Sequence, residues 1–141
     1  MAELAAFHLA FPCRDVDEAA TFYRGLGCAI GRRNDHAVII DFFGHQIVAH
    51  RAHNLELQRG IYPRHFGLMV ALDELERLEG CLVELAPETT KRALRFPGES
   101  IEHHSLQSRD PSGNVLEFKT YSDPLSAYVD RGDARIGDLP T

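Results

Sequence analysis

One order of structural elements occurs twice along this chain, and that internal duplication restricts the fold more than any other feature of the sequence. A short apolar run over 6–13 precedes an amphipathic stretch over 14–27, and three apolar segments follow within 28–51. The order then restarts with an apolar run over 64–72, a second amphipathic stretch from Asp73 and three further segments. Each half therefore predicts the element order β-α-β-β-β.

Both amphipathic stretches carry the signals of a helix start and a helix stop. Asp15 can cap the first helix, with Glu18 three residues later, and Asp73 with Glu76 repeats this spacing in the second half. The first helix has an apolar stripe that should face a core, formed by Ala19, Phe22, Tyr23 and Leu26. The expected helix stops are Gly25 and Gly27 in the first half and Gly80 in the second.

Further landmarks align between the halves in the same order. The aligned pairs are His8 with His65, Gly27-Cys28 with Gly80-Cys81, Asp41 with Asp110, and Gly44 with Gly113. Under this alignment Val48 lies opposite Glu117. Asp110, Gly113 and Asn114 are interpreted as turn residues, and a strand is expected directly after the second helix, within 81–98.

The length of 141 residues suits one domain with a core of its own. We expect a single α+β domain over 1–141, made of two paired βαβββ modules over about 5–51 and 64–121. A polar linker over 52–63 would join them, and a tail would follow over 122–141.

The composition excludes several classes of function. A formal net charge of −6 and a pI of about 5.7 disfavour nucleic acid and anionic lipid as partners. Cys13, Cys28 and Cys81 form no CxxC pair, so they indicate neither a disulfide framework nor a thiolate zinc site. The chain shows neither a secretory signal nor an apolar segment long enough to span a bilayer, so we expect a cytoplasmic protein.

Two histidines and one glutamate are the candidate metal ligands. If the modules pack around a pseudo-twofold axis, His8 and His65, which open equivalent strands, would meet near that axis. Glu117 alternates with Leu116 and Phe118, and a carboxylate buried at such a position needs a cation nearby. Hydrogen-bonded core histidines and a solvent-exposed glutamate are the alternative interpretation. Two imidazoles and one carboxylate on a divalent ion would leave positions open for water, substrate or dioxygen.

The segments "FHLAFPCRDVDEAATFYRGLGC", "HFGL" and "DPSGNVLEF" together resemble the vicinal oxygen chelate superfamily. This superfamily includes glyoxalase I, extradiol dioxygenases, fosfomycin-resistance enzymes and bleomycin-binding proteins, and the resemblance runs from about Phe7 to Tyr121. It implies paired βαβββ modules whose curved sheets surround a metal cleft, with His8, His65 and Glu117 as ligands. The glyoxalase I pattern has a fourth ligand where this chain has Val48, which cannot ligate. The chain therefore matches the three-ligand pattern of the dioxygenases and of the fosfomycin-type transferases.

Three other polar residues are candidates for catalysis or binding. His50 shares a strand face with Val48 and is a substitute fourth ligand, an acid/base group or a surface residue. Gln46, on the same face, can bond a substrate oxygen or a metal-bound water. His103 and His104 are neighbours, so one should point inward, and His104 is the second candidate acid/base group.

The resemblance implies a metal-dependent enzyme, most like a dioxygenase, acting on a small molecule with vicinal oxygens. Iron(II) is the favoured metal, with manganese, nickel and zinc as alternatives, and a homodimer is expected. A lyase or isomerase resembling glyoxalase I is the first alternative function. A non-catalytic drug- or ligand-binding protein of the bleomycin-resistance kind is the second. Fosfomycin-type transfer is less favoured, because no phosphonate and potassium pocket can be identified.

Overall fold

The computed structural model describes residues 5–53, 64–130, 132 and 135–136. The chain divides into two compact units, which are described one by one. Unit 1 comprises Met1–Gln58 and Arg109–Asn114, and unit 2 comprises Arg59–Ser108 and Val115–Thr141. No helix among the described residues is long and apolar enough to cross a membrane.

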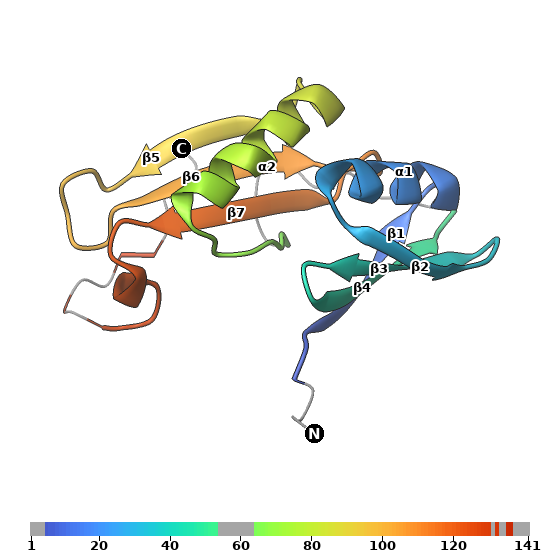
Figure 1. The fold of residues 1–141 in the computed structure, drawn as a ribbon, viewed down its shortest axis with the longest axis horizontal. Coiled ribbons are helices and arrows are strands. Elements are labelled where there is room, and N and C mark those ends of the chain that lie inside the picture. Colours follow the sequence, from blue (N-terminus) through green and yellow to red (C-terminus); the bar gives the residue numbers. More distant parts are fainter. Residues whose placement is uncertain (1–4, 54–63, 131, 133–134, 137–141) are drawn as a thin grey trace. The chain divides into compact units, whose positions relative to one another are not determined.

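Unit 1 is one helix on a four-stranded sheet (Figure 1). Its elements are β1 (His8–Cys13), α1 (Val16–Leu26), β2 (Ala29–Arg33), β3 (Ala37–Phe42) and β4 (His45–Arg51). The strand order is β1-β4-β3-β2, with β1 parallel to β4 and the other pairs antiparallel. This is the predicted β-α-β-β-β order of the first half.

The start and stop residues predicted for the first helix are confirmed in unit 1, with one exception. The Asp15 carboxylate accepts a hydrogen bond from the Glu18 backbone N–H at 2.7 Å, as an N-cap does. Gly27 ends the helix with a left-handed φ of 109°, whereas Gly25 lies inside it. The predicted apolar stripe of α1 is buried. It lies over a core formed by Val38, Ile40, Ile47 and Ala49.

Unit 2 repeats this layout with a shorter first strand. Its elements are α2 (Leu72–Leu85), β5 (Lys91–Arg95), β6 (His103–Arg109), β7 (Val115–Tyr121) and the 3-10 helix η1 (Pro124–Ala127), with strand order β5-β6-β7. The apolar run expected as a strand after residue 64 lies parallel to β7, but it pairs only through two isolated bridges, at Phe66 and Met69. The α+β class expected from the sequence is therefore confirmed, and each sheet is open-edged (Figure 1).

The bounds predicted for the second helix are wrong at both ends. The N-cap is Ala71 rather than Asp73, and it makes no side-chain hydrogen bond. The helix continues through Gly80 to Leu85, so the first part of the strand expected within 81–98 is helical and β5 begins only at Lys91. The cause is the buried stripe of Leu75, Leu78 and Leu82, which extends past Gly80. Burying one more leucine outweighs the cost of about 1 kcal/mol for a glycine in a helix.

The pairing register shows that the two halves are equivalent around the candidate site. The parallel pairs are Leu9 with Ile47 and Pro12 with His50 in unit 1, and Phe66 with Leu116 and Met69 with Lys119 in unit 2. From unit 1 to unit 2, the residue on the opening strand moves along the chain by the same number of positions in both pairs. Its partner on the last strand also moves by one constant number of positions. This register makes His8 equivalent to His65 and Val48 equivalent to Glu117, as in the sequence alignment. The pairing of Gly27 with Gly80 does not hold, since Gly80 lies within a helix.

The turn residues of the second half do more than form a turn. The Tyr23 hydroxyl donates to Asp110 Oδ2 at 2.9 Å, and Asn114 Nδ2 donates to the same oxygen and to the Pro12 carbonyl, both at 2.8 Å. Burial raises the pKa of the Asp110 carboxyl, although its hydrogen bonds oppose that shift. Asp41, the counterpart in the first half, is exposed and accepts only from the Gly44 N–H. Arg109–Asn114 is thus anchored inside unit 1.

Removing the Tyr23 hydroxyl tests this anchor. Tyr23→Phe should lower the free energy of unfolding at pH 7 by about 1–3 kcal/mol, because a buried carboxylate loses a donor. Burial and Asp110 hold the pKa of Tyr23 well above its ordinary value of 10.0. The native state then retains a proton that the unfolded state releases, so wild-type stability is lost as the pH rises above that value, and the variant should lose less. Urea unfolding at pH 7 and at a pH above 10.0 measures the free energy of unfolding of both proteins. The exposed Tyr128→Phe is the control. Equal pH dependence in Tyr23→Phe and wild type would contradict the assignment.

Gly67 permits the close approach of the 66–70 run to β7. A Cβ at this position would lie 1.7 Å from the Glu117 carbonyl oxygen, so the run would have to move. We expect Gly67→Ala to cost about 3 kcal/mol, an overpacking penalty against backbone. Gly80→Ala is the matched control, because a Cβ there meets nothing within 4 Å. It should stabilise α2 by about 0.5–1 kcal/mol. Thermal melts of both variants measure these changes in stability. An unchanged melting temperature for Gly67→Ala would refute this close approach.

Candidate active site

Glu117 is the central polar residue of unit 2. Its neighbours Leu116 and Phe118 are fully buried, and Glu117 points to the opposite face of β7. The side chain is only 8% exposed, and both carboxylate oxygens have partners. Ser105 Oγ on β6 donates to Oε1 at 2.6 Å, and His65 Nε2 lies 2.9 Å from Oε2. The carboxylate that the sequence predicted to need a cation is thus held between a hydroxyl and an imidazole.

His65 reaches Glu117 because the backbone directly after it is held against β7. The Glu117 N–H donates to the Phe66 carbonyl at 2.9 Å, and the Phe66 N–H donates to the Val115 carbonyl at 3.1 Å. The missing side chain of Gly67 permits this spacing. The His65 side chain keeps 27% of its surface exposed. One side of the imidazole is therefore accessible while the other faces a fixed carboxylate.

His8 lies in unit 1, at the start of β1, and is also held by a side chain. Its Nδ1 lies 2.7 Å from Gln46 Oε1. Because an amide oxygen only accepts, Nδ1 carries the proton and Nε2 keeps its lone pair. The ring is exposed, and no described residue bonds its Nε2. Gln46, predicted to bind substrate or a metal-bound water, contacts His8 through its side-chain oxygen in this structure.

Val48 and His50 lie on the same face of unit 1 as His8. The β1–β4 register pairs His8 with Gln46, Ala10 with Val48 and Pro12 with His50. Val48 is nearly buried, and His50 is exposed. The register also makes His50 the counterpart of Lys119 in unit 2. An exposed imidazole therefore lies two residues beyond Val48, on the same strand face.

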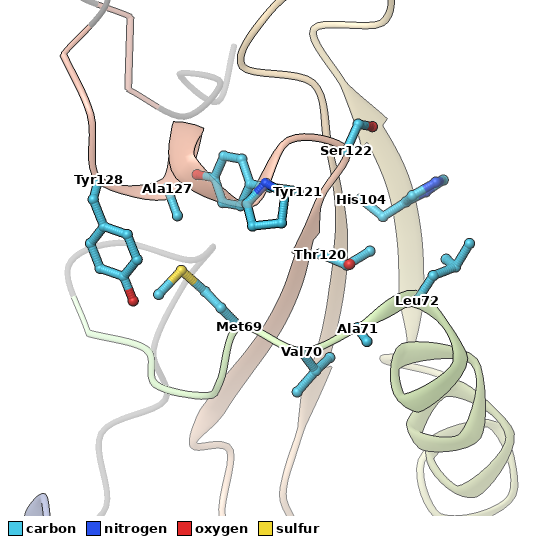
Figure 2. Close-up of a pocket in the computed structure, with 11 residues that line it drawn as sticks. Met69, Val70, Ala71, Leu72, His104, Thr120, Tyr121, Ser122, Ala127 and Tyr128 are labelled. Atoms are coloured by element: carbon cyan, nitrogen blue, oxygen red, sulfur yellow. The ribbon is translucent and has the colours of Figure 1, made fainter.

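His104, the second candidate acid/base group, lies on the face of unit 2 that α2 covers. Arg92 Nε donates to its Nδ1 at 3.5 Å, and Arg92 Nη1 also bonds Glu79 of α2 at 3.0 Å. His104 borders a cavity of about 630 Å³ at the start of α2. In Figure 2 it lies on the side of Leu72, whereas the Tyr121 ring points the other way and lies beside Ala127. The sheet thus separates the His104 ring from Glu117.

His103 is the histidine that shares the face of Glu117. It is buried, its Nδ1 lies 2.8 Å from the Ile101 carbonyl, and its ring stacks on Tyr121 at 4.6 Å. Burial lowers the pKa of His103, although the bond to Ile101 opposes that shift. The neutral ring donates from Nδ1, so Nε2 can accept a hydrogen bond. The prediction that the two histidines point in opposite directions is correct.

Ser105 and Gly67 are the residues that sequence reasoning missed. The alternation of β6 would have placed Ser105 on one face with His103, but its partner depends on the register between β6 and β7. A glycine directly after the "HF" of the second half signals a close backbone approach, yet only the structure shows that Glu117 is what it approaches.

The chemistry of this pair fits a divalent metal ion. Two ligand atoms that each lie about 2.1 Å from one ion, with a right angle between the two bonds, are about 3 Å apart. This matches the distance between His65 Nε2 and Glu117 Oε2. Imidazole and carboxylate suit iron, manganese, nickel and zinc. Among the described residues no three His, Cys, Asp or Glu side chains are grouped as a metal site. His65 and Glu117 are thus two donors whose spacing fits one ion.

Comparison with known proteins identifies the family. A glyoxalase/bleomycin resistance protein/dioxygenase from Alicyclobacillus acidocaldarius is 38% identical, with a TM-score of 0.80, over 88% of this chain and 96% of its own. The fosfomycin resistance protein FosX of Listeria monocytogenes has the same fold at 14% identity, over 86% of this chain and 95% of its own, with a TM-score of 0.67.

A lactoylglutathione lyase from Agrobacterium tumefaciens also shares the fold, at 19% identity and a TM-score of 0.60, over 84% of this chain and 95% of its own. No protein-family model and no curated protein sequence matches the chain. Identity of 38% over almost the full length of a solved structure shows common descent. The chain belongs to the glyoxalase/bleomycin resistance protein/dioxygenase family of the vicinal oxygen chelate superfamily.

Proposed function

We propose that this protein is a metal-dependent enzyme, most like a dioxygenase, that acts on a small molecule with vicinal oxygens. The observation that carries the proposal is the buried Glu117 carboxylate, which lies 2.9 Å from His65 and is held from behind by Ser105. A carboxylate this buried is costly unless it has a cation or full hydrogen bonding, so its retention beside an imidazole favours ligation. The proposed ligands are His65 and Glu117 of unit 2 and His8 of unit 1.

Each proposed ligand has a partner that orients it. Ser105 holds Oε1 of Glu117, so Oε2, on the side of His65, would be the ligand atom. Gln46 holds Nδ1 of His8 and so selects the tautomer whose Nε2 can ligate. A bound divalent ion, most favourably iron(II), would act as a Lewis acid on two neighbouring substrate oxygens.

Two histidines are proposed for proton transfer. His50 is exposed on the face that carries His8, where its imidazole can exchange a proton with a bound substrate. His104 was the second candidate, but its ring lies on the face covered by α2 and contacts Arg92. His103 therefore replaces it in the proposal, because it shares the face of Glu117 and its Nε2 can accept a proton.

Val48 favours a dioxygenase over a lyase of the glyoxalase I kind. It occupies the place equivalent to Glu117, so unit 1 contributes no carboxylate there. His50 is the specific observation that keeps the lyase as second candidate, because its exposed imidazole could supply a fourth donor. A non-catalytic ligand-binding role is disfavoured by the preserved His65–Glu117 pair. The proposal also takes the protein to be cytoplasmic and homodimeric, as the family resemblance implies.

Metal content and oxygen uptake test this function together. Protein purified without oxygen should take up about one iron(II) per chain, and His65→Ala should weaken that uptake about tenfold or more by removing a ligand. His36→Ala, in an exposed turn, is the control, and circular dichroism verifies that each variant folds. Iron-loaded protein should consume oxygen with catechols. Turnover without oxygen when loaded with nickel or zinc would favour the lyase, and unchanged metal content in His65→Ala would refute the site.

Val48→Glu tests the three-ligand assignment. The new carboxylate should act as a fourth ligand, raise metal affinity and suppress any oxygen consumption by occupying an open position. Without metal, the same carboxylate should lower the melting temperature because Val48 is nearly buried. Val48→Gln serves as control, since it adds similar volume without charge. A metal-induced rise in melting temperature that is equal in both variants would show that residue 48 does not face the metal.

A further inference from the structure

A second cavity lies on the face of unit 2 that carries Glu117, and the function proposed above does not use it. It measures about 780 Å³, within the range of about 300–1,000 Å³ typical of small-molecule sites. Lys119, Tyr121, His103 and Phe96 line it on the sheet side, and described residues after β7, among them Ser126, Tyr128 and Arg135, line it on the other. The chain after β7 therefore helps to form this cavity rather than leaving the sheet.

Two contacts attach the C-terminal residues to the loop between β5 and β6. Ser126 Oγ donates to the Ser100 carbonyl at 2.6 Å. Arg135 forms an ion pair with Glu99, and its guanidinium lies 4.7 Å from the centre of the Phe96 ring. Both contacts hold residues that border the cavity, so its outer wall is part of unit 2.

The sheet side of the cavity is aromatic. The rings of His103 and Tyr121 stack with centroids 4.6 Å apart and an interplanar angle of 26°. Phe96 lies 6.1 Å from His103 between centroids, and the Met69 side chain lies at the border. Flat rings and a thioether form favourable contacts with a planar unsaturated ligand.

The cavity also holds a positive charge that no described residue neutralises. Lys119 lines it, and its side chain makes no ion pair or hydrogen bond with any described residue. Glu117, two residues earlier on the same face, already bonds Ser105 and His65. The other lining cation, Arg135, is paired with Glu99, and the lining Asp130 carboxylate accepts from the Gly132 N–H at 2.9 Å. An ammonium on a partly enclosed apolar wall favours a ligand with an anionic group.

We propose that this cavity binds a planar aromatic small molecule that carries a carboxylate, with the ring against Tyr121 and His103 and the carboxylate on Lys119. Lys119 and Glu117 project from the same face of β7, so this ligand would lie beside the proposed metal ligands. The inference deepens the proposed function by naming a substrate class, and it rests on that function only in calling the ligand a substrate. Binding itself requires no metal.

Two matched probes test the proposal: 2-naphthoate, and 2-naphthamide as its neutral counterpart. Titration calorimetry on the full chain, both as purified and after chelation, should show naphthoate binding about tenfold tighter than naphthamide. Lys119→Gln should abolish this preference, and Lys119→Arg should restore it. Tyr121→Leu should weaken both probes alike. Equal binding of the two probes to the wild type, or an unchanged preference in Lys119→Gln, would overturn the proposal.

The sequence offers an internal control, because Lys91 is the only other lysine. Lys91 lies on β5 and does not line the cavity. Naphthoate should protect Lys119 but not Lys91 from acetylation in wild-type protein, as measured by peptide mass spectrometry, and Lys91→Gln should keep wild-type affinity. Protection of both lysines, or of neither, would overturn the proposal. If chelated protein binds naphthoate and His65→Ala retains metal, the proposed function fails and the cavity assignment stands.

Discussion

The arrangement of unit 2 depends on the buried carboxylate of Glu117. A charge at this depth is tolerated only with partners for both oxygens, and two separate parts of the sequence provide them. Ser105 comes from β6, His65 from the run that opens the module, and Gly67 supplies the clearance that lets that run lie against the β7 backbone. Because this carboxylate needs partners, β7 is a candidate ligand strand although its alternating sequence pattern is ordinary.

The two modules keep one backbone pattern and have diverged in chemistry. Their parallel strands pair in the same register, yet unit 1 has Val48 and His50 at the positions where unit 2 has Glu117 and Lys119. The turns have diverged as well: Asp41 closes an exposed turn, whereas Asp110 is buried against Tyr23 and Asn114. The buried face of each sheet fixes the register, so side chains on the opposite face can differ between the modules without shifting the strands.

Most of the fold follows from local signals, and its exceptions have tertiary causes. The order of elements, the cap at Asp15 and the stop at Gly27 were all predictable, because capping and periodicity are local properties. α2 passed its expected stop at Gly80 because Leu82 is buried beyond it. His104 was preferred to His103 on sequence grounds alone, but the side of the sheet that α2 covers decides which histidine accompanies Glu117.

The sequence by itself determined the duplication, the equivalence of His8 with His65 and of Val48 with Glu117, and the likeness to the family. These are matters of order and spacing along the chain. Only the tertiary structure decided that Ser105 and His65 bond Glu117, that Gln46 orients His8, and that the chain after η1 forms a cavity wall with Phe96 and Lys119. Such contacts join residues that are distant in sequence. Strand register and packing select these partners, and the periodicity of a single segment carries no information about them.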